Sequence, residues 1–141
     1  MEVHIRHTAG AAFLASARGH EIICDQPKEN GGEDGGMTPP ELLLASLGTC
    51  AGYYALQYLR ARKLPETGLA VRVQAEKAAA PARLGRFTIH VDAPPLEGRH
   101  EEGLLRAVRA CLIHNTMLAN PEIETMIHMR PVPLPEATMK A

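Results

Sequence analysis

The chain has 141 residues, of which 45% are hydrophobic, and its 15 basic and 16 acidic side chains leave a formal net charge of −1. We therefore expect a single domain over residues 1–141, large enough to bury about two-thirds of its unfolded surface without disulfide bonds. The balanced charge, the two Phe and the absence of Trp argue against a nucleic-acid partner, which would need a basic surface and stacking aromatics.

The amino terminus gives no sign of export. Residues 1–7 are charged and alternating, and no stretch of the sequence resembles a signal peptide or a membrane span. Three cysteines are an odd count for a disulfide-stabilised secreted domain. The sequence thus predicts a cytoplasmic protein without a membrane partner, whose thiols are reduced or catalytic.

The first third of the chain favours strands. Alternating apolar residues predict strands around residues 3–5, 11–17 and 20–25, with the last two hinged at Arg18 and Gly19. Residues 26–37 follow as a loop with four glycines and no periodicity. Such a loop is either mobile or shaped around something.

A long helix is expected from Thr38 to about Lys63. Thr38 is a good N-cap residue, Pro39 fits the first turn, and Glu41 completes a capping box. Leu64 and Pro65 end the pattern. Because this helix is apolar nearly all round, we expect cover on most sides, part of it from a partner subunit.

The remainder of the chain predicts a hairpin, a helix and a last strand. Residues 69–76 and 84–92 alternate around a tip at 78–82, a helix spans about 99–113, and residues 122–130 form a final strand. In that strand Ile123, Ile127 and Met129 should point inward. The order β-β-β-α-β-β-α-β is an α+β fold with mainly antiparallel sheets and a long central buried helix.

Cys50 lies in the apolar part of the long helix, between Gly48 and Gly52. A free buried cysteine is usually a small hydrophobic residue, and two glycines can simply permit close helix packing. Each interior glycine, however, costs a helix roughly 1 kcal/mol relative to alanine, so the pair also suggests room for a substrate at the thiol.

Cys111 is the second candidate thiol, again on an apolar helix face. We expect it near a helix C-terminus, where the helix dipole disfavours a thiolate. This suits a resolving cysteine: one thiol reduces a peroxide and becomes a sulfenic acid, and the other converts it to a disulfide. Cys24, on a strand, is expected to be a core residue.

Other chemistries remain open. Cys111 with His114, and His20 with Cys24, could each offer two metal ligands, but neither pair has the ligand density of a zinc site. We therefore expect no metal ion and no cofactor. Cys50 with His114 could instead serve a thiol hydrolase or an acyl-transfer enzyme.

Arg18 could stabilise a Cys50 thiolate, although a hairpin arginine is more often simply solvated. Glu41 could orient that arginine, but the capping box already accounts for it. Nine residues separate Glu41 from Cys50, which is about 13.5 Å of helical rise and half a turn. Glu41 could therefore reach its own Cys50 only through a kink, and otherwise would act across a dimer interface.

The sequence resembles the OsmC/Ohr family of thiol-dependent peroxidases, particularly its OsmC-like branch, over essentially its whole length. The matching stretches are residues 25–27, the Gly-Gly-Glu-Asp-Gly loop at 31–35, the segment from Thr38 to Cys50, and residues 111–116. The resemblance implies an intertwined homodimer with sites at the subunit interface. It also implies that Cys50 attacks the peroxide, Cys111 resolves it, and Arg18 and Glu41 activate the thiol.

The sequence as a whole predicts a homodimeric hydroperoxide reductase that acts in oxidative-stress defence. Its substrates would be small organic hydroperoxides, because the predicted site walls are apolar, and a dithiol would serve as reductant. The alternatives are a non-catalytic small-ligand binding or redox-sensing protein on the same fold, and a thiol hydrolase.

Overall fold

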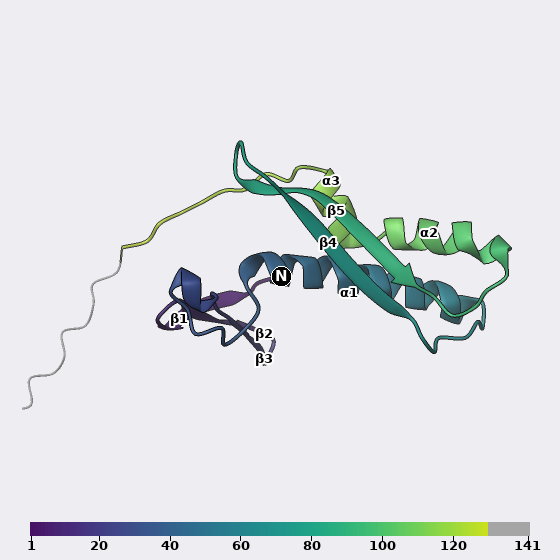
Figure 1. Ribbon diagram of the computed structural model, residues 1–141, viewed down its shortest axis with the longest axis horizontal. Coiled ribbons are helices and arrows are strands. Elements are labelled where there is room, and N and C mark those ends of the chain that lie inside the picture. Colours follow the sequence, from purple (N-terminus) through teal and green to yellow (C-terminus); the bar gives the residue numbers. More distant parts are fainter. Residues whose placement is uncertain (130–141) are drawn as a thin grey trace, which may run out of the picture.

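The structure is a computed structural model that describes residues 1–129 (Figure 1). Three antiparallel strands, β1 (His4–Ala9), β2 (Ala12–Ala17) and β3 (His20–Cys24), form an N-terminal sheet in that order. A second antiparallel sheet consists of β4 (Ala70–Ala78) and β5 (Arg83–Asp92). Three α-helices complete the fold of the described residues, so the predicted α+β class with antiparallel sheets is confirmed.

The turn between β2 and β3 occurs where the sequence predicts it. Ala17 pairs with His20, which leaves a two-residue loop of Arg18 (φ 54°) and Gly19 (φ 82°). Two successive positive φ angles are typical of the tight hairpin turns whose twist matches that of the flanking strands. The turn therefore fixes the register of the two strands.

The long helix α1 (Pro39–Ala61) begins at the predicted cap. The Glu41 carboxylate accepts hydrogen bonds from the Thr38 backbone N–H (2.7 Å) and hydroxyl (2.8 Å), and the Thr38 side chain caps the first turn. At the other end, Lys63 adopts φ 55° and the Leu64 N–H bonds to the Leu59 carbonyl (3.0 Å). This left-handed cap ends the helix two residues before the predicted Lys63.

The β4–β5 hairpin crosses over α1, and the connection at residues 79–82 matches the predicted tip (Figure 1). Phe87, Ile89 and Val91 of β5 share one face, as predicted, and are all partly buried. Ile89 and Val91 pack against the core described below.

The predicted helix over residues 99–113 is wrong, because the chain breaks it into shorter pieces. A single 3-10 turn, η2 (Gly98–His100), leads into α2 (Glu101–Arg109), and α3 (Leu112–Leu118) follows after a break. At the break Cys111 leaves the helical conformation, with ψ at 133°. The bend lets α2 pack on α1 while the Cys111 side chain becomes fully buried.

The predicted final strand at 122–130 is also wrong for the residues described. Residues 120–129 have no strand partner, and Ile123, Ile127 and Met129 are 85%, 79% and 92% exposed rather than inward. Alternating apolar residues form a strand only where a neighbouring strand supplies backbone partners, and the described chain offers none here. Arg130 lies outside the described residues.

The core lies between α1 and α2. Its buried cluster consists of Ala51, Ala55, Tyr58, Leu59, Leu104 and Val108. One side of α1 remains open, since Leu43 and Tyr53 are 39% and 58% exposed. Of the helices in the described part of the chain, none has the length and apolar character that a bilayer crossing demands.

Candidate thiol site

Cys50 lies in the middle of α1 and is partly buried. The glycines on either side of it are explained by packing. A Cβ atom on Gly48 would lie 3.0 Å from a Val73 methyl group, and one on Gly52 would lie 3.4 Å from a Val71 methyl group. Strand β4 therefore approaches the helix backbone closely at both positions, and Cys50, two residues from each glycine, lies on the other side of the helix from β4.

Cys111 is the N-cap residue of α3 and is fully buried. Cys111 lies just after the C-terminus of α2, as expected, but it also begins α3. The expected unfavourable effect of a helix C-terminus on a thiolate is therefore wrong, because the N-terminus of α3 acts on the same sulfur. Burial raises the pKa of this thiol, and the backbone N–H groups of His114 and Ile113 in the first turn of α3 partly offset that rise. The first turn of α3 thus supplies N–H groups from which a Cys111 thiolate could accept hydrogen bonds.

The two cysteines meet where α1 packs against α3. Burial and, next in size, a hydrogen bond with the Cys50 side chain raise the pKa of the Cys111 thiol above its ordinary value, outweighing the two backbone donors. Cys111 is consequently held as a neutral thiol at neutral pH. The arrangement pairs one reachable thiol with one buried, protonated thiol.

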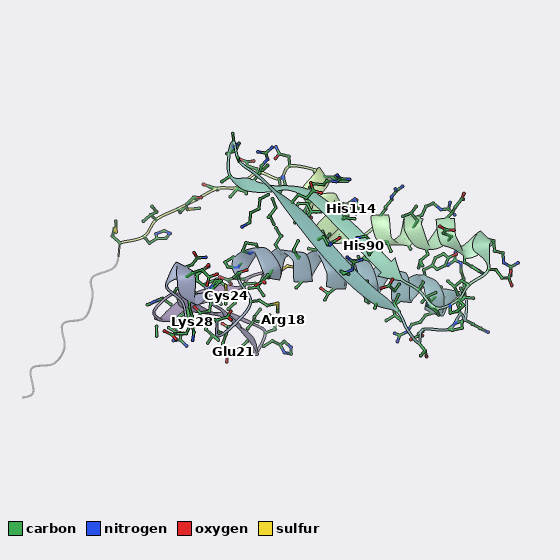
Figure 2. All side chains as sticks on the ribbon, in the orientation of Figure 1. Arg18, Glu21, Cys24, Lys28, His90 and His114 are labelled. Carbon is green, nitrogen blue, oxygen red and sulfur yellow. The ribbon has the colours of Figure 1, made fainter. Side chains whose placement is uncertain are left out.

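Arg18 lies far from this pair within a single chain. Its side chain is exposed at the turn between β2 and β3, and Figure 2 shows it in the N-terminal sheet, well away from His114 of α3. The arginine does not contribute to the electrostatic environment of the Cys111 thiol.

Glu41 is likewise engaged elsewhere. Its carboxylate caps α1, and hydrogen bonds from the Thr38 backbone and hydroxyl lower its pKa below the ordinary value. The side chain is exposed at the amino end of the helix, away from Cys50 in its middle. One chain therefore brings together the two cysteines but not the two charged residues expected beside them.

Cys24 lies at the end of β3 and is partly buried, next to Ile5, Phe13 and Leu42 at the wall of a cavity of about 420 Å³. It is separate from the two paired thiols. Among residues 1–129, no three His, Cys, Asp or Glu side chains converge as metal ligands.

Two polar residues, Asp25 in the glycine-rich loop and His114 in α3, have buried polar atoms that the sequence did not predict. The Asp25 carboxylate, whose residue is 3% exposed, accepts hydrogen bonds from the N–H groups of Gln26, Glu33 and Gly35 at 2.8–3.0 Å. These bonds, chiefly from Gly35, lower its pKa and hold the glycine-rich loop in one shape. The position of Asp25 directly before a loop rich in glycine could have predicted this role, because Asp side chains often bond to backbone N–H groups in turns.

The second is His114, in the first turn of α3. Its Nδ1 atom is the single buried side-chain nitrogen or oxygen without a hydrogen-bond partner within the described residues. The sequence named it as a candidate ligand or base, but nothing in the spacing indicated that its Nδ1 atom would be buried. Figure 2 shows the residue beside β5.

Comparisons with known proteins agree with this architecture. The family model described as OsmC-like protein matches residues 31–126. A comparison with curated protein sequences finds no significant match. Three solved structures are similar to this chain in fold, and each is less than 25% identical to it in sequence.

The first is a protein of Psychrobacter arcticus described as an osmotic stress induced and detoxification response protein, with a TM-score of 0.74, 20% identity, and coverage of 81% of this chain and 85% of that one. The second is an OsmC like protein of Mycoplasma pneumoniae, with a TM-score of 0.70, 20% identity, and coverage of 83% and 86%. The third is an organic hydroperoxide resistance protein OsmC of Legionella pneumophila, with a TM-score of 0.65, 18% identity, and coverage of 85% and 91%.

Proposed function

The chain belongs to the OsmC-like protein family, and from this premise we propose that it is a thiol-dependent peroxidase that reduces organic hydroperoxides. Cys50 is the attacking thiol and Cys111 the resolving thiol. The observation that carries the proposal is the contact between these two side chains at the junction of α1 and α3.

The reaction has three balanced steps. The Cys50 sulfur attacks one peroxide oxygen, the O–O bond breaks, and the departing alkoxide takes the thiol proton, which gives an alcohol and a Cys50 sulfenic acid. The Cys111 sulfur then displaces the sulfenic hydroxyl, which leaves as water, and a disulfide forms. An external dithiol reduces this disulfide by thiol–disulfide exchange and is itself oxidised to a disulfide.

Exposure supports this division of roles. Cys50 is partly exposed, whereas Cys111 has no exposed surface at all. A peroxide can therefore reach the first sulfur before the second. The raised pKa of Cys111 also makes it the weaker nucleophile at neutral pH, which suits the thiol that acts second.

The names of the relatives support the substrate class. Proteins of the same fold from Legionella pneumophila and Elizabethkingia anophelis are described as organic hydroperoxide resistance proteins. The apolar side chains of α1 on either side of Cys50 would favour an organic hydroperoxide over hydrogen peroxide, because moving an alkyl group out of water is favourable.

A homodimer completes the proposal. The open face of the N-terminal sheet carries Ile5, Phe13 and Ile22, which are 62%, 41% and 50% exposed. A groove of about 580 Å³ with mainly apolar walls lies between α1 and β4. These surfaces support a second copy of the chain as their cover. In the proposed dimer, Arg18 and Glu41 of one subunit act on Cys50 of the other, where the guanidinium would stabilise the thiolate.

The direct test compares three serine variants. Cys50→Ser should reduce consumption of cumene hydroperoxide, with a dithiol present, to the level of a protein-free blank. Cys111→Ser should give one stoichiometric burst and then accumulate a Cys50 sulfenic acid, seen as a gain of one oxygen by intact mass. Cys24→Ser should behave like the unmodified protein, because Cys24 lies apart from the thiol pair.

A substitution that removes the charge of Glu41 but keeps its shape separates the two roles of this side chain. Gln can still accept a hydrogen bond of the capping box but lacks the negative charge that favours a helix N-terminus, so Glu41→Gln should lower helix stability only slightly. Activity should fall if the carboxylate orients Arg18 across the interface. If the unmodified protein keeps a free Cys50 thiol after excess peroxide, the peroxidase proposal fails and the thiols are structural.

A further inference from the structure

A second cavity lies apart from the thiols. Strand β5 and helices α2 and α3 enclose a volume of about 360 Å³, at the small end of the range of roughly 300–1,000 Å³ typical of ligand pockets. Five apolar side chains form its walls: Ile89, Val91, Leu104, Leu105 and Val108. Neither Cys50 nor Cys111 lines it, so what it binds is independent of the function proposed above.

The charged residues of this cavity are separated along its length. Glu101 and Arg109 both line it from α2, eight residues apart, which is about two turns of helix and about 12 Å along the axis. Neither forms a salt bridge with another residue in the described range 1–129. The cavity therefore has a cationic end at Arg109 and an acidic end at Glu101.

His114 also lines the cavity. Its Nδ1 atom is buried and has no hydrogen-bond partner among residues 1–129, so a hydrogen bond from the ring into the cavity would come from Nε2. His114 and Ile89 also line a smaller cavity of about 90 Å³ with Leu47 and Phe87, so the apolar surface continues beyond the ring.

We propose that this cavity binds a medium-chain monocarboxylate of about eight to ten carbons, a length that matches the span of about 12 Å along α2. The carboxylate pairs with Arg109 and accepts a hydrogen bond from the His114 ring. The alkyl chain lies along Ile89, Val91 and Val108. Glu101 at the far end disfavours a second acid group, so the site selects monocarboxylates over dicarboxylates.

Calorimetric titration of the full reduced chain with decanoate, well below its micelle concentration, tests the proposal. We expect saturable binding of one decanoate per chain, and at least tenfold weaker binding of decanedioate and of decan-1-ol. Arg109→Gln should weaken decanoate binding at least tenfold. Arg106→Gln is the matched control, because Arg106 is exposed on the same helix but does not line the cavity, and it should leave binding unchanged.

The acidic end has its own variant. Glu101→Gln should bring the affinity for decanedioate to within about threefold of that for decanoate, without strengthening decanoate binding by a similar factor. In NMR spectra, decanoate should shift the methyl resonances of Ile89 and Val91. Glu101 and Arg109, the two substituted side chains, are exposed, so these substitutions should not unfold the protein.

Three results would overturn the proposal. The first is no saturable decanoate binding at millimolar concentration, which is also the outcome if a second copy of the chain seals the cavity. The second is equal binding by the unmodified protein and Arg109→Gln. The third is a set of decanoate-induced shifts confined to the groove between α1 and β4.

Discussion

The N-terminal sheet and the α1–α2 layer are built from equally apolar sequence but end in opposite environments. In the layer, Ala51, Ala55 and Leu59 of α1 have no exposed surface. In the sheet, no apolar side chain of β1–β3 is fully buried. The difference arises because two helices with small residues at their contact exclude water, whereas a cavity of about 420 Å³ separates the sheet face that carries Ile5 and Phe13 from Leu42 at the start of α1.

That contrast indicates where a partner is needed. Monomeric proteins rarely leave a contiguous apolar sheet face in water, so the open face points to an interaction surface. The α1–α2 layer, by comparison, can hold itself together within one chain. Stability should therefore depend on the layer, and assembly on the sheet.

The largest expected effect is on assembly. We expect the unmodified protein to sediment as a dimer at micromolar concentration, with an interface well over roughly 2,000 Å² in total. Ile22→Asp places a charge on the open face and should shift the species to monomer or aggregate. His4→Asp, an exposed position on the opposite face of the sheet, is the control. A stable monomer of the unmodified protein would contradict the dimer.

A cavity in the layer should cause the largest loss of stability. Leu59 is fully buried in the core cluster, so Leu59→Ala should lower the free energy of unfolding by about 2–5 kcal/mol. Leu112→Ala makes the same chemical change at a side chain that is 60% exposed and should cost less than about 0.5 kcal/mol. Urea denaturation followed by circular dichroism measures both. Equal losses would mean that the layer is not the stabilising unit.

The contact between α1 and α2 can be tested by adding one methyl group. A Cβ atom on Gly103 of α2 would overlap the ring and hydroxyl of Tyr58, which bonds to the His100 ring nitrogen at 3.1 Å. Gly103→Ala should therefore cost about 1–3 kcal/mol of unfolding free energy despite its better helix propensity. Gly98→Ala meets nothing within 4 Å and should be nearly neutral. A neutral Gly103→Ala would show that the two helices can separate at no cost.

The smallest effect is expected where the sheet joins α1. Asp25→Asn keeps one acceptor oxygen but loses the charge that three N–H groups stabilise, so the melting temperature should fall. Asp34→Asn is the control, because Asp34 has φ 58° and Asn tolerates this conformation equally well.

The same carboxylate makes stability depend on pH. Hydrogen bonds, chiefly from Gly35, depress the pKa of Asp25 in the folded state. Its contribution is therefore complete above the unfolded value of about 3.9 and is lost as the pH falls through the lower folded value. Asp25→Asn should remove this part of the acid sensitivity, and an unchanged acid profile would contradict the role of the carboxylate.

Local chemistry determined much of this protein. The capping box of Thr38 and Glu41, the Arg18–Gly19 turn and the alternation of the β4–β5 hairpin all depend on residues within a few positions of one another, and the sequence predicted each of them. The motif around Cys50 likewise indicated the family, because it is a contiguous stretch.

Only the tertiary structure decided the rest. Whether Cys111 ends one helix or begins the next depends on where α2 and α3 pack against α1, which no spacing in the sequence records. The burial of the His114 Nδ1 atom also depends on packing between segments distant in the chain, since the residue lies against β5. Residues 122–129 show the same principle in reverse: an alternating pattern becomes a strand only when a neighbouring strand supplies its backbone hydrogen bonds.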